Sequence, residues 1–178
     1  MIKYWLVLLG GFLTSRGLLA QTAQVHTEVQ VLIRDFMQIS EISRGQLVTL
    51  GMDDEEDFAN GITKIVPDNL LISTTVEYNV FARAAFPYFT SLQNNRSFPA
   101  SVLSLEVDVQ EPMSGSTVFN KINGLVTNNQ PLILNGAPMF KSYLNIKYSI
   151  PAAMAKNILV KSGAGLYTNT IIYTITPQ

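Results

Sequence analysis

The residues best suited to chemistry are the five consecutive carboxylates of Asp53–Asp57. Clustered oxygen ligands are what hard cations bind, so Asp53, Asp54 and Asp57 are weak candidates for a calcium site. The EF-hand spacing is absent, and consecutive side chains of an extended chain cannot all face one ion. A solvated loop or a first helical turn, where acids suit the helix dipole, is the favoured interpretation. We therefore predict neither a metal nor a cofactor.

The residue sets that catalysis requires are missing. His26 is the only histidine, and it lies too close to the N-terminus to be central in a Ser-His-Asp triad. The sequence contains no Gly-x-Ser-x-Gly, phosphate-loop or dinucleotide-binding pattern. Glu77 and Glu106 fall on strand faces predicted to meet solvent, where lone carboxylates usually serve solubility. We predict that this chain is not an enzyme.

Composition narrows the class of protein further. The absence of cysteine excludes disulfides, thiolate metal sites and thiol catalysis. Hydrophobic residues make up 47% of the chain and charged residues only 14%, which is typical of an exported β-protein with hydroxyl and amide side chains outside. The net charge is −1 and the basic residues are scattered, so we predict no nucleic-acid partner.

Residues 1–20 have the layout of a signal peptide. Lys3 precedes the apolar run Tyr4–Leu13, and cleavage after Ala20 would leave Gln21 as the first residue. An uncleaved anchor is the alternative, but this run is far shorter than the roughly 20 residues that span a bilayer. We expect an exported protein of the periplasm, cell surface or extracellular space, without a membrane span after cleavage.

Alternating apolar and polar residues dominate the rest of the chain, and they predict strands with one buried face. Segment 151–159 is either a short helix or an irregular crossover. We expect an all-β fold: an antiparallel immunoglobulin-like (Greek-key) β-sandwich of about 7–9 strands, with at most one short helix. The predicted strands are 25–33, 47–50, 70–84, 102–109, 131–134, 144–150 and 165–178.

The first and last of these strands organise the predicted domain. Residues 21–34 form an N-terminal strand or a projecting arm, and residues 35–178 form the sandwich. A strand as apolar as 165–178 needs a partner in a sheet. Whether the N-terminal strand of the same or of another molecule supplies it stays open. The predicted strand-pairing residues are Val25, Val29, Val31 and Ile33 in the first strand, and Tyr167, Ile171, Tyr173 and Ile175 in the last.

The C-terminal segment also resembles a known family. Gly165-Leu166-Tyr167-Thr168-Asn169-Thr170, followed by an alternating strand, is similar to the end of spore-coat-protein-U-like domains and archaic chaperone–usher pilins. The resemblance implies an incomplete immunoglobulin-like sandwich that a donor strand of the next subunit completes. It also implies surface fibres, with other subunits or a chaperone as partners. Subunits of this kind often carry a disulfide, which this chain cannot form.

Two functions follow as expectations. The first is a non-enzymatic, pilin-like or fimbrial structural subunit that assembles by strand addition. The second is a monomeric secreted immunoglobulin-like module that binds a glycan or a protein through loops 86–97 and 111–130. Strand addition loses its basis if segment 25–33 pairs within its own domain and every sheet edge is covered. It gains support if an edge is open or the arm projects.

Overall fold

The computed structural model describes residues 28–41, 47–109 and 116–178. The chain divides into an N-terminal segment that ends at Ile33 and a compact body from Arg34 to Gln178. Residues 28–33 belong to no strand, although a strand was predicted there. Val25 lies outside the described residues.

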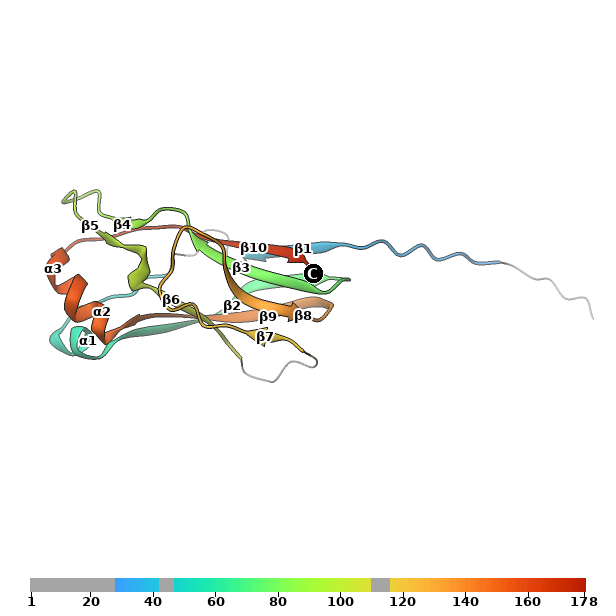
Figure 1. Cartoon of the computed structure of the whole chain (residues 1–178), viewed down its shortest axis with the longest axis horizontal. Helices are drawn as coiled ribbons and strands as arrows, with labels where there is room; N and C mark the ends of the chain where they lie inside the picture. Colours follow the sequence, from blue (N-terminus) through green and yellow to red (C-terminus); the bar gives the residue numbers. More distant parts are fainter. Residues whose placement is uncertain (1–27, 42–46, 110–115) are drawn as a thin grey trace, which may run out of the picture. The chain divides into compact units, whose positions relative to one another are not determined.

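Two four-stranded sheets and one two-stranded ribbon make up the body (Figure 1), and every strand pairing is antiparallel. The prediction of an all-β chain with antiparallel pairing is confirmed. The first sheet has the order β1 (Met37–Glu41), β2 (Gly61–Thr74), β9 (Met139–Pro151), β6 (Ser104–Asp108). The second has the order β10 (Ile171–Pro177), β3 (Tyr78–Ala84), β8 (Gln130–Gly136), β7 (Val118–Phe119). The ribbon joins β4 (Tyr88–Thr90) to β5 (Ser97–Pro99).

Helices are short but more numerous than predicted. The expected helix after β9 is present and runs through α2 (Ala152–Met154), the π-helical turn η2 (Ala155–Leu159) and α3 (Val160–Ser162). The acidic run forms a further helix, α1 (Glu55–Asn60), and η1 (Ala100–Val102) is a 3₁₀ turn. The expectation of at most one short helix was therefore wrong. No helix in the described part of the chain has the length and apolar character that crossing a membrane requires.

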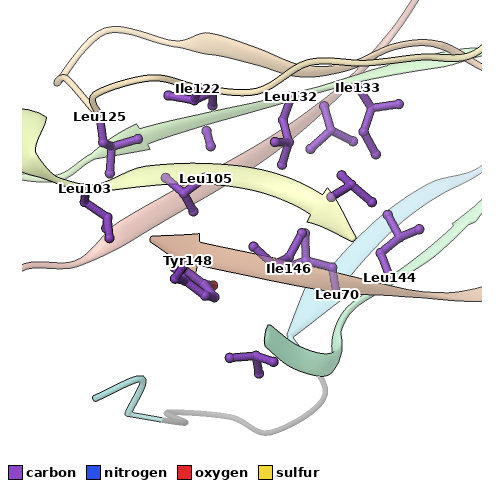
Figure 2. Packing of buried hydrophobic residues seen from close by; sticks show 14 of the residues in the cluster. Leu70, Leu103, Leu105, Ile122, Leu125, Leu132, Ile133, Leu144, Ile146 and Tyr148 are labelled. Carbon is purple, nitrogen blue, oxygen red and sulfur yellow. The ribbon is translucent and has the colours of Figure 1, made fainter. Parts of the chain in front are cut away.

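Both four-stranded sheets contribute inward-facing side chains to one hydrophobic core (Figure 2). Ile72, Leu105 and Ile146 come from the first sheet, and Val80 and Leu132 come from the second, and all five are fully buried. Alternate residues of each strand fill this layer because successive strand side chains point to opposite faces. Burying each such side chain contributes about 1.5–3 kcal/mol, and this core has no disulfide to assist it.

The predicted long strand 70–84 is two strands in two different sheets. β2 ends at Thr74 in the first sheet, and β3 begins at Tyr78 in the second. The corner is closed locally, since the Thr74 hydroxyl donates to the Val76 carbonyl at 2.9 Å and accepts from its N–H at 3.1 Å. The two buried faces keep the same sequence phase across the corner, so the alternation did not reveal the break. Residues 47–50, also predicted as a strand, are in none.

We expect Ile146→Ala to lower the free energy of unfolding by about 2–5 kcal/mol, because the side chain leaves a cavity at a fully buried site. Ile65→Ala on the neighbouring strand β2 is the matched control, since Ile65 is 46% exposed and should cost about 1 kcal/mol or less. Urea unfolding followed by circular dichroism measures both. Equal decreases in the free energy of unfolding would contradict the assignment of Ile146 to the core and of Ile65 to the surface.

Candidate strand-addition site

The C-terminal strand β10 lies at the edge of its sheet. It pairs with β3 over its whole length, from Ile171 opposite Ala84 to Pro177 opposite Tyr78. Within the described ranges no strand pairs with its other side. Strand β1 is likewise the edge of the first sheet, and it runs beside β10 (Figure 1). We call this pair of adjacent, unpaired strand edges the β1–β10 edge.

Side chains at the β1–β10 edge are covered less well than those one strand further in. On β3, the inward residues Tyr78, Val80, Ala82 and Ala84 are completely buried. The inward residues of β10 stay partly exposed although they are apolar and pack against the same core. These residues are Ile171, Tyr173 and Ile175. The difference indicates that the core is complete under β3 and open at β10.

The backbone of β10 is open in the same direction. In an antiparallel ladder, an edge strand directs half of its N–H and C=O groups away from its only neighbour. For β10 these groups face the side where no described strand pairs. The strand therefore offers both hydrogen-bonding groups and a half-covered apolar face to an added chain.

A buried hydrogen-bond network holds β10 to the first sheet. The Tyr148 hydroxyl, on β9, donates to Asn69 Oδ1 at 2.6 Å and lies 2.9 Å from the Tyr173 hydroxyl. Asn69 and Tyr148 are buried, and Tyr173 is partly buried as a residue. The network thus joins the two sheets at the β1–β10 edge, where apolar packing is thinnest.

Burial sets the protonation of these phenols. Burial raises the pKa of Tyr148 to about 12, and the hydrogen bond from Tyr173 opposes this rise. The pKa of Tyr173 is raised well above its ordinary value, first by burial and then by the charge and hydrogen bond of Tyr148. The carboxylate of Glu41, at the end of β1, raises both further. Both hydroxyls are therefore neutral at physiological pH and can donate hydrogen bonds.

Tyr167 does not belong to the last strand, although it was predicted there. The strand begins at Ile171, and only a single bridge, from Thr90 to Thr168, precedes it. The ring of Tyr167 instead packs on Phe98 at 4.8 Å between centroids, and its hydroxyl donates to the Ser162 carbonyl at 2.6 Å. The predicted face of Tyr167, Ile171, Tyr173 and Ile175 is thus divided between an aromatic cluster and β10.

The described residues of the N-terminal segment are open to solvent. Val29 is 78% exposed, and Val31 and Ile33 are each 79% exposed. All three have the same parity in the sequence, so they would share one face of an extended chain. The fourth predicted residue, Val25, lies outside the described part of the chain.

Two of the three calcium candidates, Asp54 and Asp57, use their carboxylates at the start of a helix, and Asp53 contributes only its N–H. Asp54 is the N-cap of α1, and its side chain accepts from the Asp57 N–H at 2.9 Å. Asp57 Oδ2 accepts in turn from the Asp53 N–H at 2.8 Å. Among the described residues, no group of three or more acidic, histidine or cysteine side chains could hold a metal ion.

The hydroxyl network was not predicted from the sequence, although two of its members left a signal. Tyr148 and Tyr173 were both expected on inner strand faces, where a phenol needs a hydrogen-bond partner. Nothing in the spacing indicated that they would meet, because they belong to different sheets. The sequence pattern did not mark Asn69 as a buried residue, since it stands just before the predicted strand that begins at Leu70.

We expect Tyr148→Phe to lower the free energy of unfolding at pH 7 by about 1–2 kcal/mol, because Asn69 Oδ1 loses its donor. Tyr143→Phe, an exposed hydroxyl on the same strand, is the matched control and should change little.

The pH dependence follows from the raised pKa of Tyr148. Below pH 10 the phenol is protonated in the folded and the unfolded chain, and its full contribution is present. Between pH 10 and about 12 only the unfolded chain ionises, so wild-type stability falls by about 2–3 kcal/mol from this group. Urea unfolding at pH 9 and pH 11 should show a smaller fall in Tyr148→Phe. An unchanged fall would show that Tyr148 is not buried as described.

Comparison with known proteins assigns no family. No protein-family model matches this chain, and no curated protein is significantly similar to it. What the chain does must therefore be inferred from the geometry of the β1–β10 edge and from the exposed segment before it.

Proposed function

We propose that this chain is a non-enzymatic, exported structural subunit that forms fibres by strand addition. The N-terminal segment of one copy would pair with the β1–β10 edge of another copy. The observation that carries the proposal is the partly exposed apolar face of β10, an edge strand with no described neighbour on its outer side.

The segment before the body has the properties that such an edge requires. Val29, Val31 and Ile33 repeat every second residue, as the inward side chains of an added strand must. Six extended residues reach about 20 Å, which is close to the length of a seven-residue strand such as β10. Each of these side chains would gain about 1.5–3 kcal/mol on full burial.

The chain is fixed where the body begins. Three hydrogen bonds link Phe36 to Thr75: the Phe36 N–H donates to the Thr75 hydroxyl, and the Thr75 N–H and hydroxyl donate to the Phe36 carbonyl. These bonds anchor the start of β1 in the first sheet.

The strand order supports an incomplete immunoglobulin-like sandwich. An immunoglobulin constant-type domain has sheets ordered A-B-E-D and C-F-G. In chain order, β1, β2, β6 and β9 correspond to A, B, D and E, and the first sheet has the order β1-β2-β9-β6. Strands β3 and β10 are neighbours, as C and F are. Strands β7 and β8, which follow β6 in the chain and extend the second sheet beyond β3, depart from this scheme. No described strand corresponds to G, and in the proposal the donated strand would take its place beside β10.

Strand addition of this kind is open-ended. The donating segment and the accepting edge are different surfaces, so each copy that donates still has its own edge free. Such heterologous contacts produce filaments unless the rotation closes a ring. The resemblance of the C-terminal segment to chaperone–usher pilins and the signal-like N-terminus agree with export and surface assembly.

The test is assembly of the chain from Gln21 onward, followed by size-exclusion chromatography with light scattering. We expect multimers from the wild type and monomers from a variant without residues 21–33. A peptide of residues 24–35 should bind this variant and raise its thermal midpoint, because it fills the open edge. A wild type that stays monomeric at high concentration, together with a peptide that does not bind, would rule out strand addition.

A pair of arm variants tests the predicted face. Val31→Asp should abolish assembly, because it would bury a charge against Ile171, Tyr173 and Ile175. Gln30→Asp is the matched control, since its side chain points away from the core, and it should assemble as the wild type does. Equal loss in both variants would contradict an alternating, one-sided fit.

A further inference from the structure

A hollow of about 500 Å³ lies away from the β1–β10 edge, between strand β5 and the helical segment after β9. These two walls are about 60 residues apart in sequence, and both lie at the end of the body that carries the helices (Figure 1). The hollow is wide open to solvent, so a ligand would rest on it and would not be enclosed. Its lining residues are Arg96, Ser97, Phe98, Pro99, Asn157, Ile158, Lys161 and Ser162.

Hydrogen bonds hold the two walls in fixed positions. Asn94 Nδ2 donates to the Ala164 carbonyl at 2.8 Å, and its Oδ1 accepts from the Arg96 N–H at 3.0 Å. Phe98 stacks between Phe89 and Tyr167, with ring centroids 5.3 Å and 4.8 Å away. The hollow is therefore preformed and does not depend on a loop that must close.

The guanidinium of Arg96 is placed by the backbone opposite it. Its Nη1 donates to the Ser162 carbonyl at 3.3 Å. It also lies over Gly163, where any Cβ would overlap the guanidinium, and Gly163 has a φ of +78° that favours glycine. One of five guanidinium N–H donors is used in this contact, so the others remain for a ligand.

Charge in the hollow has one sign. Arg96 and Lys161 line it, and no acidic residue does. Among the described residues, neither of these cations is in a salt bridge, and the only salt bridges there join Glu106 to Lys121 and Lys147. Two unpaired cations in one concave site favour an anion.

The rest of the lining suits a sugar better than a simple ion. Pro99 and Ile158, which are only partly buried, provide apolar surface for the face of a sugar ring. Asn157 and Ser97 add an amide and a hydroxyl that can bond to ring hydroxyl groups. Asn157 and Ile158 belong to the π-helical turn η2, and such turns often occur at functional sites.

We infer that this hollow binds an acidic saccharide, with the sugar carboxylate between Arg96 and Lys161 and the ring over Pro99 and Ile158. Arg96 supplies the planar pair of donors that matches a carboxylate, and Lys161 adds a second positive charge. The site does not involve β10 or the N-terminal segment. It therefore stands or falls independently of strand addition.

The test is a nuclear magnetic resonance titration of the Val31→Asp variant, which is monomeric whether or not the wild type assembles, using the disaccharide of galacturonic acid. The neutral galactose disaccharide is the matched probe. We expect saturable shifts of amide signals around Ser97 and Asn157 with the acidic probe, and none with the neutral one. Arg96→Gln and Lys161→Gln, each added to this variant, should weaken binding at least tenfold, and added salt should weaken it in the variant itself.

Lys156→Gln is the control variant, because Lys156 is exposed on the same helical segment but does not line the hollow. It should bind within twofold of the Val31→Asp variant alone. Arg96 also bonds the helix end, so Lys161→Gln is the cleaner variant if Arg96→Gln is less stable. The proposal is overturned by absent saturable binding, by equal binding of the neutral probe, or by an equal loss in Lys156→Gln.

Discussion

An apolar strand at the edge of a sheet has two needs, a hydrogen-bonding neighbour and a cover for its inner face. In this body β10 has the neighbour on one side only, and its inner residues remain partly exposed. Other contacts near β10 partly make up for the missing neighbour and the incomplete cover. The Tyr148–Tyr173 hydroxyl pair places a satisfied polar contact where apolar packing is thinnest. Strand β1, only five residues long, is the adjacent edge strand of the first sheet.

Because the chain has no cysteine, the non-covalent contacts of β10 matter more for its stability. No covalent link restrains β10, so its position depends on the ladder with β3 and on the hydroxyl network. In the proposed assembly the next copy covers β10, and this binding adds to the stability of the folded body.

The opposite end of the body is organised by other interactions. There the aromatic cluster of Phe89, Phe98 and Tyr167 and the bonds from Asn94 and Arg96 tie the β4–β5 ribbon to the helical segment. The inferred saccharide hollow lies between these parts. If copies assemble through β10, each one adds a further hollow to the fibre. Weak individual sites on such an array would act together as an avid surface.

The sequence by itself determined which residues face the core, because side-chain alternation is a local property of an extended chain. Val80, Ala82, Leu105 and Ile146 were placed inward correctly on this ground alone. It also offered a short helix as one of two alternatives for segment 151–159, and a first helical turn as one of two for the acidic run. These signals depend on neighbours within a few residues.

Only the tertiary structure decided which segments meet. The sequence did not indicate the corner at Thr75–Glu77, because the alternation of apolar and polar residues keeps its phase where the chain passes from one sheet to the other. Tyr167 lies outside the last strand, and its ring packs against Phe98. Arg96 and Lys161, and likewise Tyr148 and Asn69, come together through long-range pairing. The physical reason is that the energy of strand pairing depends on contacts between segments that are distant in the sequence. The alternation of apolar and polar residues carries no information about these contacts.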